Sequence, residues 1–125
     1  MPSRQKFVMS WHVAGTLAAD LNIRFKAPSN CTLVHVSAVG SNSKPAGLTI
    51  GTSDDADEFL TKKAIGASNV PNEFDFDDFA TYANKAYPRI EDGDVVILAL
   101  DYDYNGGGSA SASADVTIVA TFLEG

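Results

Sequence analysis

The chain has 125 residues, of which 45% are hydrophobic and 20% are charged, the proportions of an ordinary globular domain. This length suits one domain with its own core and is too short for two ordinary domains. Nine basic residues stand against sixteen acidic ones, which gives a net charge of −7. Because phosphates and anionic lipid headgroups attract lysine and arginine, this balance disfavours nucleic-acid and membrane partners. We therefore expect a single acidic domain spanning 1–125.

The cysteine content and the N-terminal residues indicate where such a domain folds. Cys31 is the only cysteine, so neither an internal disulfide nor a multi-cysteine zinc site can form. In the first fifteen residues the longest apolar run, which includes Phe7 and Val8, ends at Met9 and is too short for the apolar region of a signal peptide. Nowhere does an apolar run approach the eighteen or so residues that a membrane span needs. We expect folding in a reducing cytoplasm.

The first half of the chain alternates between apolar and polar residues. A period of two is typical of half-buried strands. The stretches predicted as strands are 6–13, 21–25, 31–39 and 48–50. In the first of them Trp11 shares a face with Phe7 and Met9, and we expect its large ring to lie in the core.

The segment 53–66 has a different period and predicts a short helix. Ala56, Phe59, Leu60 and Lys63 share one face at three- and four-residue spacing. Ser53 or Asp54 would cap its start, acids lie in its first turn, and lysines lie in its last turn. This order of charges suits a helix dipole.

The second half predicts two further long strands. Between 70 and 87, aromatic residues lie among acids and suggest a short strand followed by one or two helical turns. Strands are expected at 95–104 and 115–123, separated by a Gly/Ser/Ala segment at 105–114 that we expect to be a mobile loop. The whole pattern predicts an all-β fold, an antiparallel β-sandwich that is jelly-roll-like and has one or two short helices.

Two acidic runs could offer the hard oxygen ligands that calcium prefers. They are Asp54, Asp55, Asp57 and Glu58 in the first run, and Asp75, Asp77 and Asp78 in the second. The first run lacks the glycine and the final glutamate of a twelve-residue calcium loop. The simpler interpretation is a helix start decorated with favourable acids, so we expect no metal.

The sequence contains no recognisable catalytic motif. Asp101 and Asp103 share one strand face and could act as an acid–base pair, but such a position is ordinarily the solvent face of a half-buried strand. His12 and His35 fall on predicted strands without further ligands at close spacing. No nucleophile-elbow or active-site cysteine signature is present. We expect no enzymatic activity and no cofactor.

Several short segments carry a resemblance when they are taken in order. They are Arg24-Phe25-Lys26-Ala27-Pro28, Thr32-Leu33-Val34-His35-Val36-Ser37, Leu48-Thr49-Ile50-Gly51, Asp54-Asp55-Ala56-Asp57-Glu58-Phe59-Leu60, Glu91-Asp92-Gly93-Asp94-Val95-Val96 and the terminal stretch 114–125. This ordered set, which covers the chain from about residue 20 to its end, resembles small virion proteins of tailed bacteriophages. The resemblance implies a jelly-roll-like sandwich bound to the outer capsid surface as a decoration or stabilising protein, without enzymatic activity.

The resemblance also implies partners. These are the major capsid protein or another virion protein, and further copies of the chain in a closed homo-oligomer, for which we favour a trimer. The segment 1–6 carries Arg4 and Lys6 without an acid. It could be a flexible arm that an acidic capsid surface orders, or a frayed terminus.

Two other functions remain open at the level of sequence. A β-sandwich module could bind a carbohydrate or a receptor through its loops, with Tyr102, Tyr104 and the glycines at 106–108 as contacts. The second is a glycan hydrolase that uses Asp101 and Asp103.

Overall fold

The structure is a computed structural model, and it describes residues 5–125. The described chain is almost entirely strand, turn and loop. Its elements are β1 (Lys6–Thr16), β2 (Leu21–Lys26), β3 (Cys31–Val39), β4 (Gly47–Thr52), β5 (Leu60–Ala64), β6 (Asn72–Phe74), the 3-10 helices η1 (Phe76–Asp78) and η2 (Ala80–Asn84), β7 (Arg89–Ile90), β8 (Val95–Asp101), the 3-10 helix η3 (Gly108–Ser111) and β9 (Ala114–Glu124).

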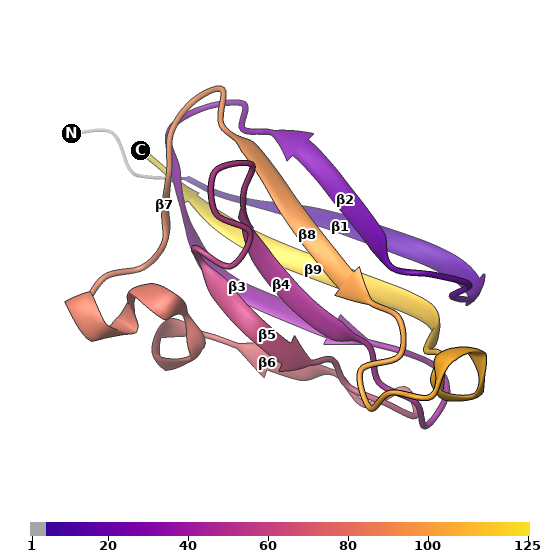
Figure 1. The fold of residues 1–125 in the computed structure, drawn as a ribbon. Coiled ribbons are helices and arrows are strands. Elements are labelled where there is room, and N and C mark those ends of the chain that lie inside the picture. The colour runs from indigo at the N-terminus through magenta and orange to yellow at the C-terminus, as the bar shows by residue number, and fades with distance from the viewer. Residues whose placement is uncertain (1–4) are drawn as a thin grey trace.

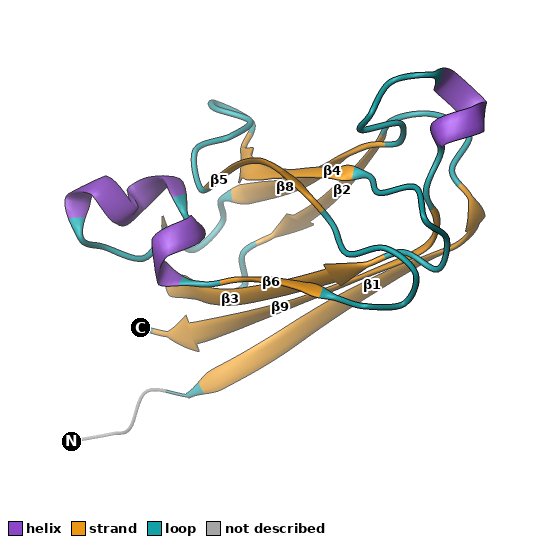
Figure 2. Ribbon diagram, turned by 90° about the horizontal axis from the view of Figure 1, so that it is seen from below, coloured by secondary structure: helices purple, strands orange, loops and turns teal. Residues whose placement is uncertain are grey.

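The strands form two sheets that pack face to face (Figures 1 and 2). The first sheet has the order β1-β9-β3-β6, with β7 also paired to β3, and the second has the order β2-β8-β4-β5. Every pairing between these strands is antiparallel. The predicted antiparallel β-sandwich is therefore confirmed.

Period-two alternation places the core between the sheets. The inward side chains of β9 and β8 are almost fully buried, namely Val116, Ile118, Ala120 and Phe122 on β9 and Val96, Leu98 and Leu100 on β8. The Phe122 ring stacks on Phe7 of β1 at 5.0 Å between centroids and meets Phe25 of β2 edge-on at 5.8 Å. Phe122 thus joins both sheets at the flank where β1 and β2 lie.

The predicted helix over 53–66 is wrong. Residues 53–58 form turns and bends, and Leu60–Ala64 is strand β5, which pairs with β4. Gly51 permits the tight turn, because a Cβ atom at that position would lie 2.2 Å from the Asp55 carbonyl oxygen. Phe59 and Leu60 are both buried although they are adjacent, because Phe59 lies in the bend before β5 begins at Leu60 and is not bound by the alternation of the strand.

The connection between β6 and β7 carries the helical turns that were expected there. The helices η1 and η2 follow one another, and Lys85 ends η2 in the left-handed conformation with φ of 58°. Phe76 packs against Tyr82 at 5.3 Å and against Tyr87 at 4.8 Å between ring centroids. These aromatic contacts fold the connection into a small cluster of its own beside β3.

The Gly/Ser/Ala segment is only partly the loop that the sequence suggested. Residues 105–111 form a largely exposed tip that contains η3, but Ala112, Ser113 and Ala114 are buried. The Ser113 amide donates to the Tyr102 carbonyl, and the Leu17 amide donates to the Ser113 carbonyl. Residues 112–114, which the sequence pattern places in a loop, are therefore packed into the sandwich.

A truncation at the junction of the two sheets tests this account of the core. Phe122→Ala should lower the free energy of unfolding by about 3–5 kcal/mol, because it removes a fully buried ring and its contacts with Phe7 and Phe25. Urea denaturation followed by circular dichroism measures the change. The control is Val8→Ala on β1, whose side chain is 60% exposed, and its effect should stay within about 0.5 kcal/mol. Equal effects of the two substitutions would contradict the packing described.

Candidate functional site

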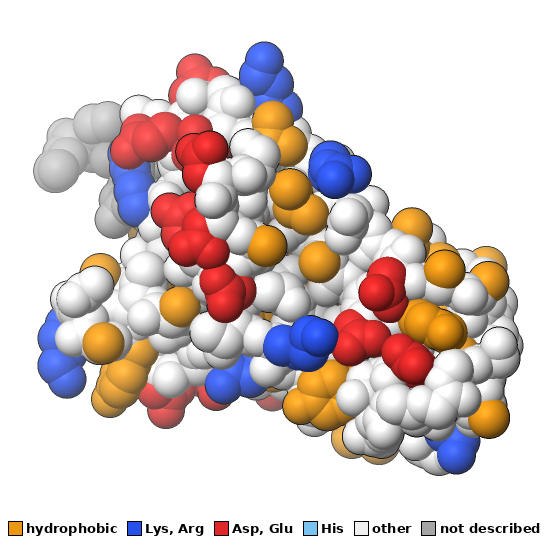
Figure 3. Space-filling view, viewed as in Figure 1, with side chains coloured by type: hydrophobic (Ala, Val, Ile, Leu, Met, Phe, Trp, Pro, Cys, Tyr) orange, Lys and Arg blue, Asp and Glu red, His pale blue; other side chains and the backbone are white. Residues whose placement is uncertain are grey.

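An acidic cluster lies at the end of the sandwich where β8 ends. It consists of Asp20, Asp101 and Asp103, which each bring one carboxylate oxygen within 4.8 Å of the others. Lys62 of β5 donates a hydrogen bond of 2.9 Å to Oδ2 of Asp101. Figure 3 shows acidic side chains in this region with a basic side chain beside them. The cluster joins three segments that are far apart in the sequence.

Backbone groups occupy the other two carboxylates of this cluster. The Tyr102 amide donates to Oδ1 of Asp20 at 3.2 Å, and the Gly108 amide donates to Oδ2 of Asp103 at 2.9 Å. The hydrogen bond from Lys62 lowers the pKa of Asp101, and the same bond raises the pKa of Lys62. A catalytic acid needs a raised pKa, so Asp101 is poised to stay charged. The arrangement ties the start of β2, β5 and the loop after β8 together.

The first acidic run does not gather into a comparable group. The Thr52 hydroxyl donates a hydrogen bond of 2.8 Å to Oε2 of Glu58, and the Asp57 amide donates one of 3.4 Å to Oδ1 of Asp55. Hydrogen bonding with Asp55 and its negative charge raise the pKa of Asp57. Asp54 lies in the same exposed turn. Calcium needs six to eight oxygen ligands around one point, and these four residues do not supply a group of three carboxylates within 4.8 Å.

The second acidic run, by contrast, brings its three carboxylates within 4.8 Å of one another. Asp75 precedes η1, and its amide donates to Oδ2 of Asp78 at 3.0 Å, while the Asp78 amide donates back to the Asp75 carbonyl. Hydrogen bonding with Asp77 is the largest cause of the raised pKa of Asp75. These carboxylates are on the surface and close the turn at the start of η1.

The residues expected to contact partners do not form one surface. Lys6 is exposed at the start of β1, and Arg4 lies outside the described residues. Tyr102 is partly buried against the core, and Tyr104 is 37% exposed and covers Gly47 of β4. The start of β1 and the loop after β8 lie at opposite ends of the sandwich (Figure 1). Lys6 and the tyrosines therefore cannot contact the same small ligand.

The histidines and the cysteine are also apart. His12 on β1 hydrogen bonds with Thr117 of β9 at 2.8 Å, and His35 on β3 lies 3.2 Å from Oε1 of Glu73. Strand β9 separates the two histidines in the sheet. Cys31 is buried at the start of β3, and this burial raises the pKa of its thiol. These three residues do not assemble a nucleophile and a base.

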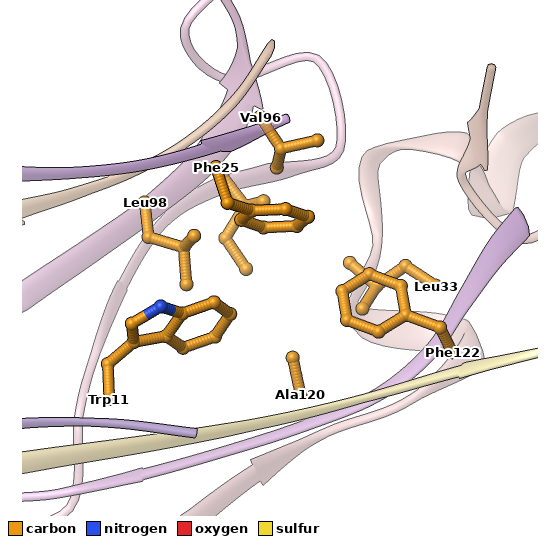
Figure 4. A pocket seen from close by; sticks show the side chains of 8 residues that line it. Trp11, Phe25, Leu33, Val96, Leu98, Ala120 and Phe122 are labelled. Atoms are coloured by element: carbon orange, nitrogen blue, oxygen red, sulfur yellow. The ribbon is translucent and has the colours of Figure 1, made fainter. Parts of the chain in front are cut away.

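An apolar cavity of about 10 Å³ lies between the sheets, which is about the smallest space that holds one water molecule. Its walls are Trp11, Phe25, Leu33, Ile50, Val96, Leu98, Ala120 and Phe122. Figure 4 shows Trp11 and Phe25 close together at one side of it, and their rings stack at 5.5 Å between centroids. Trp11 packs against the core, as predicted. The cavity is a packing gap and is too small for an organic ligand.

The electrostatic role of the Lys62–Asp101 pair can be tested by pH. The pKa of Asp101 lies below that of an unfolded aspartate. The contribution of Asp101 to stability is therefore complete above the unfolded pKa, and it is lost as the pH falls through the lowered pKa. Asp101→Asn should lower the free energy of unfolding by less than about 1 kcal/mol at neutral pH, since the pair is partly exposed. The difference from the unsubstituted chain should shrink as the pH falls through this lowered pKa and vanish below it.

Urea denaturation at a series of pH values measures this difference. Asp54→Asn, in the exposed turn after β4, is the control for the loss of one negative charge. A difference for Asp101→Asn that grows as the pH falls would contradict the assignment.

The comparisons with known proteins indicate a fold and no family. Neither a protein-family model nor a curated protein matches the sequence. A solved structure of the cyanophage Pam1 capsid asymmetric unit contains a chain with the same fold, at a TM-score of 0.57 and 14% identity, over 98% of this chain and 87% of that one. A chain of the infectious bursal disease virus Gx strain aligns at a TM-score of 0.39 and 12% identity, over 95% of this chain and 32% of that one, which is too distant to support an argument.

Proposed function

We propose that the chain is a structural protein of a virion without enzymatic activity, and that it decorates and stabilises the outer capsid surface of a tailed bacteriophage. The observation that supports this proposal most directly is the extent of the match with the cyanophage capsid chain. The alignment covers 98% of this chain and 87% of that one, so the two domains correspond over most of their lengths.

The strand order supports the finer description of the fold as a jelly roll. The chain crosses from β1 to β2 and from β2 to β3, and each crossing changes sheets. The last strands return in the same way, with β8 between β2 and β4 and β9 between β1 and β3. The orders β1-β9-β3-β6 and β2-β8-β4-β5, interleaved in this way, are compatible with a jelly roll, a fold that viral capsid domains use.

The chemistry of the surface is compatible with a structural role. The carboxylates of Asp101 and Asp103 are engaged by Lys62 and by the loop after β8, and the pKa of Asp101 is lowered. A net charge of −7 keeps separate copies soluble before they assemble. Cys31 is buried and unpaired, so a reducing cytoplasm would not weaken the fold.

The partner that we propose is the major capsid protein or another protein of the same particle. The copies would bind after the shell has formed, at sites that repeat with its symmetry. Saturation at a fixed ratio to the shell lattice is the property that separates such a decoration protein from a module that binds a carbohydrate or a receptor.

Capsids assembled without this chain provide the test. The purified protein should co-sediment with them in a saturable way at a fixed ratio of copies to capsid subunits. It should also raise the temperature at which the shells open, because ligands that bind only the intact state stabilise it. An unrelated acidic β-sandwich of similar size is the control for non-specific adhesion. No saturable binding would contradict capsid decoration, and a glycan panel read at Tyr102 and Tyr104 would then test the carbohydrate-binding alternative.

A further inference from the structure

Strand β1 has one unpaired edge along its whole length. It has eleven residues and pairs with β9 on one side, from Lys6 opposite Leu123 to Thr16 opposite Ala114. Among residues 5–125 no strand pairs with its other side, and Figure 2 shows it as the outermost strand of its sheet. In an antiparallel strand, alternate residues direct their backbone N–H and C=O groups toward each neighbour. The outer half of these groups is therefore available for a further strand.

The remaining sheet edges carry the features that ordinarily prevent strand addition. Charged side chains and short length both protect an edge. Strand β2 exposes Arg24 and Lys26, β5 carries Lys62 and Lys63, and β6 has only three residues. From Phe7 to Gly15, by comparison, β1 contains no lysine, arginine, aspartate, glutamate or proline. Its irregularity lies at the far end, between Val13 and Thr16.

The flank beside this edge is also incompletely covered. The inward side chains of β1 and β2 pack against the core but stay partly exposed, namely Phe7, Met9, Trp11 and Val13 on β1 and Leu21, Ile23 and Phe25 on β2. On the outward face of β1, Val8 is 60% exposed. A strand added to β1 would cover part of this apolar surface as well as the free backbone groups.

We propose that a second copy of this chain binds at this edge, with the two β1 strands antiparallel about a two-fold axis near Ser10. The pairing would join the β1-β9-β3-β6 sheets of two copies into one continuous sheet. It would use residues 6–14, and the register of β1 with β9 is regular from Lys6 to Val13. Each copy has one such edge, so the assembly closes after two copies, as isologous interfaces do.

The charges at the ends of β1 favour a second copy in this orientation. Lys6 lies at the start of the strand, and at its other end the Gly15 amide donates a hydrogen bond of 2.7 Å to the Asp115 carboxylate. Antiparallel pairing near Ser10 brings Lys6 of one copy beside Ala14 and Gly15 of the other. Two strand spacings, about 10 Å, then separate the backbones of Lys6 and Asp115, a distance that the lysine and aspartate side chains bridge together. Both ends of the interface gain this attraction.

The absence of charge between those ends allows two acidic copies to approach. Each copy carries a net charge of −7, and such copies repel one another wherever acids face acids. The acidic groups at Asp101 and Asp75 lie on segments outside β1. A parallel arrangement of the two β1 strands would place Lys6 against Lys6, so the antiparallel arrangement is the favoured one.

This inference concerns the free protein and does not depend on the proposed virion role. Sedimentation equilibrium of the full chain should give a mass of twice 13.2 kDa at micromolar concentrations. Ser10→Lys places two like charges at the two-fold axis on an exposed position and should raise the dissociation constant at least tenfold. Ser37→Lys is the matched control, because Ser37 lies in the same sheet but its strand is paired on both sides, with Val119 of β9 opposite Ser37 on one side and Glu73 of β6 on the other. This substitution should leave the dimer intact.

Disulfide cross-linking tests the antiparallel pairing of the two β1 strands independently of the dissociation constant. Cys31 is buried, so Ser10→Cys adds one accessible thiol, and paired antiparallel strands bring Cα atoms to the 4.4–6.8 Å or so that a disulfide needs. Mild oxidation should yield a covalent dimer from Ser10→Cys and much less from Ser37→Cys. A monomer at all concentrations would overturn the proposal. So would a trimer, the state favoured by the sequence resemblance, or any oligomer that Ser10→Lys leaves unchanged while circular dichroism shows both variants folded.

Discussion

The placement of β9 between β1 and β3 is the constraint on which the rest of this structure depends. Its inward side chains, from Val116 to Phe122, are all buried and meet the opposite sheet. Because side chains in a strand alternate between faces, a shift of one residue in either pairing would turn this apolar row toward solvent. The burial of alternate residues therefore fixes the register of β9 with both β1 and β3.

The same placement also decides which surfaces the molecule leaves open. Inserting the C-terminal strand between β1 and β3 moves β1 to the margin of its sheet, although the sequence of β1 has the alternation and low charge of a central strand. It also brings Asp115 to the end of β1 through the hydrogen bond with Gly15. A long neutral edge with opposite charges near its two ends is thus a product of topology.

The segment after β4 shows how tertiary packing overrides a local preference. Ala56, Phe59 and Leu60 have helical spacing and the acids precede them in a favourable order, but the β4–β5 hairpin satisfies the backbone in another way. The Phe59 amide donates to the Ile50 carbonyl, and the Thr52 amide donates to the Asp55 carbonyl. Gly51 admits this turn because it has no Cβ atom. An isolated helix of this length would be marginal in water. The hairpin that buries both Phe59 and Leu60 in the sandwich is therefore more stable than the helix.

The sequence by itself determined the class of the fold and the faces of its long strands, because a period of two requires only that one side of each strand be buried. Phe7 to Val13, Leu21 to Phe25, Val96 to Leu100 and Val116 to Phe122 follow that rule. The tertiary structure alone decided which strands are neighbours, and therefore that Asp20 and Lys62 join Asp101 and Asp103, and that β1 is an edge. Pairing between segments more than a hundred residues apart, as in β1 and β9, leaves no local pattern, since it depends on how several apolar faces are buried together.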